Sequence, residues 1–213
     1  MALLNNELKD QLKGILNQMK DEVTVALFTS TEDCESCEDT KNFMEEVSGV
    51  SDKVQLKTYD IKADQEVAET LNISLTPSIV LLDKNGKNNG IKFNGIPAGH
   101  EINSFITGLI EVSGAGEELP ETFLERLGKI DKPVHIKVFV TLGCPHCPGA
   151  VSKAHKLALE SEFITAEMIE SQTFFSEADK YDVSGVPKII INEDHDLVGN
   201  QPIESFMDII ESL

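Results

Sequence analysis

Two Cys-x-x-Cys motifs lie 110 residues apart in this chain of 213 residues, and their surroundings repeat with them. The motifs are Cys34-Glu-Ser-Cys37 and Cys144-Pro-His-Cys147, and the same shift places Pro77 over Pro187. Each proline follows the second cysteine of its motif by 40 residues. A repeat of this length indicates a duplicated domain, because solenoid repeats have periods of about 20 to 50 residues.

Both halves of the chain show the same order of expected elements. An apolar strand leads into the cysteine motif, a helix follows it, and then come a second strand, a short polar helix and a strongly apolar strand that begins after the proline. We expect strands at 23–29, 54–59 and 78–83 and at 134–141, 163–169 and 188–192, and further helices at Leu3–Lys20, 64–71, 121–129 and 175–181. This alternation predicts an α/β fold, with a mixed sheet covered on both faces.

A short glycine-containing segment separates the two halves. It reads Ser113-Gly114-Ala115-Gly116 and is followed by two glutamates and Pro120, a composition typical of linkers. We therefore expect two domains, residues 1–116 with the first cysteine pair and residues 117–213 with the second.

The charge and hydropathy of the chain argue against several partners. Its 37 acidic and 18 basic residues give a net charge of −19, which disfavours binding to nucleic acid or to anionic lipid. No apolar run is long enough to span a membrane, and charged residues interrupt the first twenty positions, so we expect no secretory signal. We expect a cytoplasmic protein, and in that compartment cysteine pairs are more often catalytic than structural.

The duplicated pattern resembles the thioredoxin fold, in which a strand, a Cys-x-x-Cys helix start and a later proline stand in this order. Two such units that both keep their cysteines resemble the glutaredoxin-like protein disulfide oxidoreductases. The resemblance implies two tandem thioredoxin-like domains, each with a central mixed sheet flanked by helices. It also implies redox-active disulfides Cys34–Cys37 and Cys144–Cys147 and no separate cofactor or metal. In this family the proline is cis, and the residue before it offers its backbone to an extended substrate, which here assigns substrate binding to Thr76 and Pro77 and to Val186 and Pro187.

The first cysteine of each pair is the expected nucleophile. Cys34 and Cys144 fall where a strand ends and a helix begins, and there the unpaired N–H groups and the helix dipole favour a thiolate. Cys37 and Cys147 come about one turn later, so we expect them to resolve the mixed disulfide.

We expect the two pairs to differ in reactivity. Five carboxylates surround Cys34 in the sequence, whereas no acidic residue occurs between Thr141 and Lys156. Negative charge opposes formation of a thiolate, while Pro145 fixes the start of the helix and His146 favours the anion. The sequence therefore predicts that Cys144 and Cys147 form the main and more oxidising pair.

Two further interpretations concern polar and aromatic residues. Thioredoxins carry a buried acid six positions before the first cysteine, but here those positions hold Phe28 and Val138, which leaves His135 or Lys137 as polar substitutes. Phe174 and Phe175 stand at helical offsets from Tyr181, and we expect both to lie in the core.

The favoured function is a protein dithiol–disulfide oxidoreductase that reduces, oxidises or isomerises protein disulfides. A thioredoxin reductase-like flavoprotein or glutathione is its expected electron donor. The alternative is a dedicated electron carrier from a flavoprotein reductase to a peroxidase such as a peroxiredoxin. A zinc-binding or structural module is less favoured, because 106 residues separate the two pairs whereas four-cysteine zinc sites usually space them by about 15 to 20.

Overall fold

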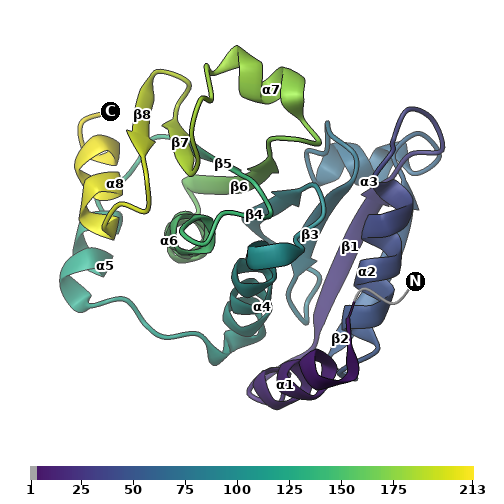
Figure 1. Ribbon diagram of the computed structural model, residues 1–213. Coiled ribbons are helices and arrows are strands. Elements are labelled where there is room, and N and C mark those ends of the chain that lie inside the picture. Colours follow the sequence, from purple (N-terminus) through teal and green to yellow (C-terminus); the bar gives the residue numbers. More distant parts are fainter. Residues whose placement is uncertain (1–3) are drawn as a thin grey trace.

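The computed structural model describes residues 4–213, and its strands form one eight-stranded mixed sheet (Figure 1). The strand order is β2-β1-β3-β4-β6-β5-β7-β8. The first half comprises α1 (Asn6–Leu16), β1 (Val23–Thr29), α2 (Cys37–Ser48), β2 (Val54–Asp60), α3 (Gln65–Thr70), β3 (Ser78–Leu82), β4 (Asn88–Asn94), the 3-10 turn η1 (Gly99–Glu101) and α4 (Ile102–Ile110). The second comprises α5 (Glu121–Leu127), β5 (Val134–Val140), α6 (Cys147–Glu160), β6 (Ile164–Glu170), α7 (Phe175–Lys180), β7 (Lys188–Ile191), β8 (His195–Val198) and α8 (Ile203–Ile210).

The two halves repeat the same pairing of strands. β1 lies between parallel β2 and antiparallel β3, and β5 lies in the same way between β6 and β7. Both faces of the sheet carry helices, so the predicted α/β fold with two thioredoxin-like units is confirmed. The start expected for the first helix at Leu3 lies outside the described residues.

The junction between the halves is a pair of strands that the sequence does not reveal. β4 pairs with β6 in parallel, with Ile91 opposite Ala166 and Asn94 opposite Ile169. Each strand would otherwise be an edge with unpaired backbone groups, and pairing satisfies them. One continuous sheet therefore holds the halves in a fixed relation.

The core lies mainly on one face of that sheet. There the buried side chains of both halves form a single cluster, which includes Phe93 of β4 and Phe105 of α4 in edge contact at 5.3 Å. Figure 1 shows α4 and α6 on this face and α7 beyond the other. On the opposite face two smaller clusters form around Phe28 beneath α3 and around Phe139 beneath α7.

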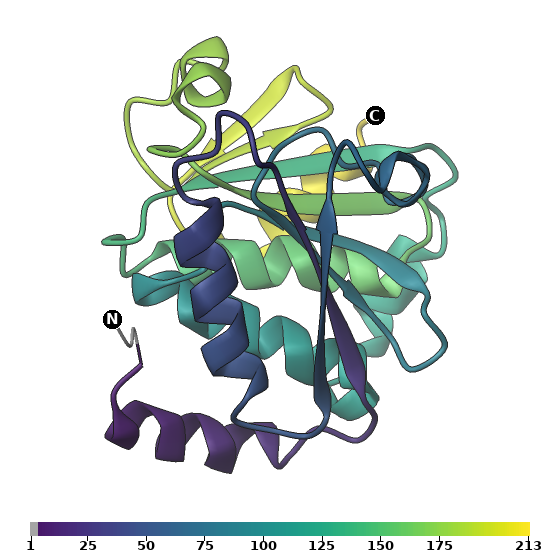
Figure 2. The ribbon, with the colours of Figure 1, turned by 90° about the vertical axis from the view of Figure 1, so that its right-hand side faces the viewer.

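The N-terminal helix is anchored on the first cysteine helix. The backbone N–H of Leu4 and the ammonium group of Lys9 both lie 3.1 Å from the Glu46 carboxylate of α2. Figure 2 shows α1 running across the end of α2.

The glycine-containing segment between the halves is partly built into the fold. Residues 111–115 continue α4 as a π-helical turn that contains Gly114 at a φ of 81°. Ser113 is buried, and its hydroxyl accepts a hydrogen bond from the backbone N–H of Lys20 at 3.2 Å. The domain boundary between residues 116 and 117 stays a prediction.

Candidate functional site

The first cysteine pair stands at the start of α2. Cys34 and Cys37 form a disulfide with their Cα atoms 5.4 Å apart. Cys37 is buried and its sulfur accepts a hydrogen bond from the backbone N–H of Ser30 at 3.4 Å, whereas Cys34 is partly exposed. Attack on a substrate needs an accessible sulfur, so this order of exposure favours Cys34 as the nucleophile of its pair.

The second pair stands at the start of α6. Cys144 and Cys147 form a disulfide with their Cα atoms 5.5 Å apart. Cys147 is 0% exposed and Cys144 is 9% exposed, while Pro145 and His146 between them are exposed. Here too the first cysteine is the one that a substrate reaches more easily.

The first turns of the two helices differ in charge. In α2 the first turn carries Glu38 and Asp39, whereas the first turn of α6 carries no acidic residue and includes Pro148. Carboxylates at a helix start compete with a thiolate for the positive end of the helix dipole. The first turns therefore differ in charge, and the difference in reactivity between the two pairs stays a prediction.

Both prolines sit beside a cysteine pair with cis peptide bonds before them. The bonds are Thr76–Pro77 and Val186–Pro187. The sulfur of Cys144 lies 3.8 Å from the carbonyl oxygen of Val186. Within residues 4–213 no backbone hydrogen bond engages the N–H or carbonyl of Thr76, so its peptide groups are available to an added strand.

His135 and Lys137 do not substitute for the missing buried acid. Side chains alternate along β5, so both point to the α7 face, whereas the cysteines belong to the core on the other face. The imidazole of His135 lies 2.9 Å from Glu167, and the ammonium of Lys137 contacts Tyr181 and Glu193. The suggestion that either assists the cysteines was wrong.

A buried acid that no motif revealed lies on a turn that packs against the segment leading to the second pair. Glu101 is 0% exposed and ends η1, a turn held against the segment before Cys144 by a hydrogen bond from the backbone N–H of His100 to the carbonyl of Leu142 at 2.9 Å. Burial raises the pKa of Glu101 to about 7, although the hydroxyl of Ser104 donates to its carboxylate at 2.5 Å. The other carboxylate oxygen has no partner in the described part of the chain.

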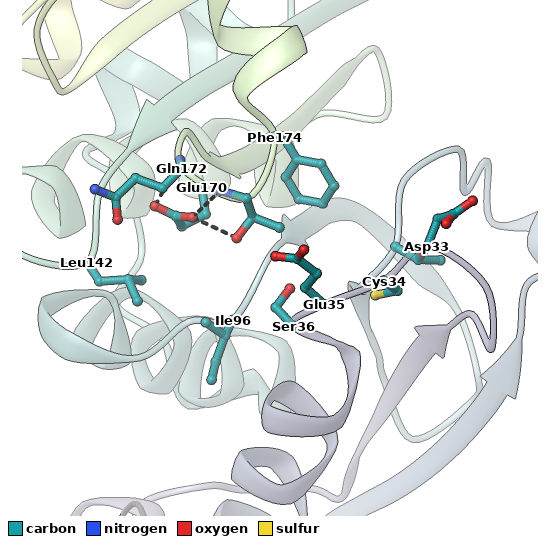
Figure 3. Close-up of a pocket in the computed structure, with 11 residues that line it drawn as sticks. Asp33, Cys34, Glu35, Ser36, Ile96, Leu142, Glu170, Gln172 and Phe174 are labelled. Atoms are coloured by element: carbon teal, nitrogen blue, oxygen red, sulfur yellow. Dashed lines mark hydrogen bonds between the residues drawn. The ribbon is translucent and has the colours of Figure 1, made fainter.

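The first cysteine pair opens into a cleft that both halves build. The cleft has a volume of about 680 Å³, and its walls include Cys34, Glu35 and Thr76 of the first half (Figure 3). Leu142 and Phe174 of the second half form the facing wall. The full lining is Asp33, Cys34, Glu35, Ser36, Thr76, Ile96, Leu142, Glu170, Gln172, Thr173 and Phe174.

The two phenylalanines before and at the start of α7 have different environments. Phe174 is half-buried and packs on the Phe139 cluster, whereas Phe175 is 70% exposed. The prediction that both lie in the core was wrong for Phe175, because α7 turns only one of the two neighbouring side chains toward the sheet.

Residues 4–213 contain no group of three or more histidine, cysteine, aspartate or glutamate side chains placed to hold a metal ion. Their four cysteines are all paired within their own motifs. No helix in the same range combines the length and the apolar character that crossing a bilayer requires.

Comparison with known proteins finds relatives over the whole chain. A thioredoxin domain pattern matches residues 134–211. A mutant of the alkylhydroperoxide reductase AhpF from Enterococcus faecalis has a structure with a TM-score of 0.91 at 27% identity, covering 98% of this chain and 99% of that one. A protein disulfide oxidoreductase from Aeropyrum pernix K1 has a TM-score of 0.90 at 30% identity, covering 98% of this chain and 92% of that one.

A longer relative shares only part of its length with this chain. The alkyl hydroperoxide reductase AhpF of Staphylococcus aureus is 25% identical over 205 residues, which are 96% of this chain and 37% of the relative. The chain thus spans little more than a third of such relatives.

A pair of thioredoxin folds with a disulfide at the start of one helix in each defines a thiol–disulfide oxidoreductase. The chain belongs to the protein disulfide oxidoreductase family, whose tandem architecture it shares from end to end.

Proposed function

We propose that the chain is a protein dithiol–disulfide oxidoreductase with Cys144 as its main nucleophile. The Cys144 thiolate attacks one sulfur of a substrate disulfide, forms a mixed disulfide and releases the other substrate sulfur as a thiolate. Cys147 then loses its proton and attacks the sulfur of Cys144, which releases the second substrate thiol. Two electrons pass to the substrate and the Cys144–Cys147 disulfide forms; oxidation of a substrate runs the same steps in reverse.

The observation that carries this proposal is the placement of Cys144. Its sulfur lies beside the Val186 carbonyl, before a helix whose first turn holds no acid, and its partner Cys147 is fully buried. A substrate strand placed along Val186 and Pro187 brings a disulfide to the sulfur that is easier to reach. We propose the same substrate role for Thr76 and Pro77 beside Cys34. Pro145 favours the thiolate by fixing the start of the helix, and His146 by offering a ring N–H as a hydrogen-bond donor.

Glu101 is the proposed proton acceptor for Cys147. A resolving thiol that is buried cannot give its proton directly to water, and an acid whose pKa is about 7 accepts a proton efficiently near neutral pH. The turn that carries Glu101 packs against the segment leading into this cysteine pair. In this proposal a residue of the first half takes part in the chemistry of the cysteine pair of the second half.

The proposed setting is the cytoplasm, with a flavoprotein reductase as electron donor. The relatives named as alkyl hydroperoxide reductases favour a second candidate function, a carrier that passes electrons to a peroxiredoxin. The presence of both cysteine pairs favours the broader oxidoreductase function, since a dedicated electron carrier needs only one cysteine pair. Glutathione is the alternative donor.

Insulin reduction by three forms of the chain tests the proposal. The wild type and Cys34→Ser/Cys37→Ser should both reduce insulin, with dithiothreitol as reductant, and Cys144→Ser/Cys147→Ser should lose most of the rate. A Cys144→Ser/Cys147→Ser protein as active as the wild type contradicts the assignment of the main pair. Replacing dithiothreitol by NADPH with a flavoprotein reductase, or by glutathione, identifies the donor, and adding a peroxiredoxin with peroxide tests the carrier function.

A further inference from the structure

The cleft at Cys34 is lined by acidic residues, whereas the first turn of the helix after Cys144 holds none, and we infer that the cleft selects basic, extended protein segments as the substrates of the Cys34–Cys37 pair. This inference rests on the proposed disulfide exchange and adds a substrate class to it. The two pairs would then serve different proteins.

The shape of the cleft fits a polypeptide. Its volume of about 680 Å³ is that of a site for several side chains, and it is bounded on opposite sides by different halves of the chain. Thr76 lines it and has unengaged peptide groups, so an extended segment can pair with Thr76 while its disulfide meets Cys34.

The charge of the cleft selects among polypeptides. Its lining holds Asp33, Glu35 and Glu170 and no lysine, arginine or histidine. Figure 3 shows the Glu35 carboxylate pointing into the space between the halves, close to Phe174. Lys62, which lies outside the lining, pairs with Glu32 at 2.5 Å and also attracts Asp33, so among the lining carboxylates it is Asp33 that has a nearby positive charge and not Glu35. A substrate lysine or arginine beside the disulfide meets an uncompensated carboxylate.

Two of the lining residues have separate tasks. Glu170 is 2% exposed and accepts hydrogen bonds from the N–H and the hydroxyl of Thr173, both at 2.7 Å, so it holds the facing wall in place. Glu35 is exposed, and its carboxylate is the group that distinguishes basic from acidic substrate segments. Phe174 offers a half-buried ring for the apolar stems of basic side chains or for an aromatic neighbour of the substrate cysteine.

The test uses two fluorogenic peptides that contain the same disulfide, flanked by lysines in one and by glutamates in the other. Cys144→Ser/Cys147→Ser keeps only the first pair, and dithiothreitol regenerates it. We expect its kcat/KM for the lysine peptide to exceed that for the glutamate peptide by about fivefold or more at low ionic strength, with the ratio falling as salt is added. The ratio is informative because a change in the intrinsic reactivity of Cys34 affects both peptides equally.

Glu35→Gln in that background should reduce the ratio at least about twofold. Glu38→Gln is the matched control: it removes the same charge equally near in sequence to the pair but on α2, outside the lining, and should leave the ratio within error. Cys34→Ser/Cys37→Ser, which keeps only the second pair, should show little preference. An equally large preference in that variant would assign the effect to the net charge of the chain and overturn the inference.

Two outcomes separate this inference from the proposed function. Equal rates with both peptides, in a variant that still reduces the neutral hydroxyethyl disulfide, contradict the substrate class alone. Failure of the wild type to reduce any of the three disulfides contradicts the proposed oxidoreductase itself.

Discussion

The backbone N–H of His100 donates a hydrogen bond to the carbonyl of Leu142 at 2.9 Å, and this contact joins the two halves directly beside the second cysteine pair. It fixes η1 against the segment leading to Cys144, and with it the buried carboxyl of Glu101. A turn of one thioredoxin unit is thus part of the immediate surroundings of the other unit's cysteine pair.

Glu101 should make the stability of the chain depend on pH between about 4.5 and 7. Its pKa is raised from 4.5 to about 7 by burial, so the folded state binds a proton more tightly than the unfolded state. The resulting stabilisation is fully present below the unfolded pKa and is lost as pH rises through the folded one, by about 3 kcal/mol in total. Denaturant unfolding of wild type and Glu101→Gln across this range checks it: the wild type should lose stability relative to the variant as pH rises. A difference in unfolding free energy between the two proteins that does not change with pH would contradict the raised pKa of Glu101.

His155 should make the chain less stable as the pH is lowered, which is opposite to the effect of Glu101. It is buried on α6, 4.7 Å from the Phe93 ring of the other half, and burial lowers its pKa to about 3, although the Lys92 backbone and Glu167 act in the opposite direction. The stabilisation is present above the unfolded pKa and is lost as pH falls from about 6.5 toward 3, by up to about 5 kcal/mol. Denaturant unfolding measured at decreasing pH should show a smaller loss of unfolding free energy for His155→Leu than for the wild type. Equal losses would mean that His155 is not the acid-sensitive group.

Gly99 should be sensitive to any side chain. A Cβ atom there would lie 2.4 Å from the carbonyl oxygen of Leu142, and its φ is 58°. Gly86 is the matched control, with a φ of 76° and nothing within 4 Å of an added Cβ. We expect Gly99→Ala to cost about 2 to 4 kcal/mol and Gly86→Ala about 1 kcal/mol, because only the first adds a clash to backbone strain. Similar thermal shifts for the two variants would show that the close approach is absent.

The sequence alone located the repeated elements and cysteine sites because each depends on local pattern. Apolar runs and the proline positions placed β1 at Val23 and β7 at Lys188 as the structure has them. Side chains alternate along β5, so Lys137 points to the opposite face from Ile136 and Val138. The same pattern could therefore have shown from the sequence that Lys137 does not reach the cysteines.

The remaining features depend on contacts between distant segments. Glu101 stands in an ordinary Gly-His-Glu sequence, which gives no sign that its carboxyl is buried in the folded chain. The pairing of β4 with β6 and the cleft between Glu35 and Phe174 likewise arise from the docking of two units, which no local pattern encodes.

The most direct test of the central claim is the rate at which iodoacetamide alkylates each cysteine of the fully reduced protein near neutral pH, resolved by mass spectrometry. Cys144 should react at least about tenfold faster than Cys34, because it precedes a helix whose first turn carries no acidic residue, whereas the first turn after Cys34 carries Glu38 and Asp39. Replacing His146 by alanine should reduce the ratio between the alkylation rates of Cys144 and Cys34. Equal rates at the two positions, or faster alkylation of Cys34, would contradict the assignment of Cys144 as the main nucleophile.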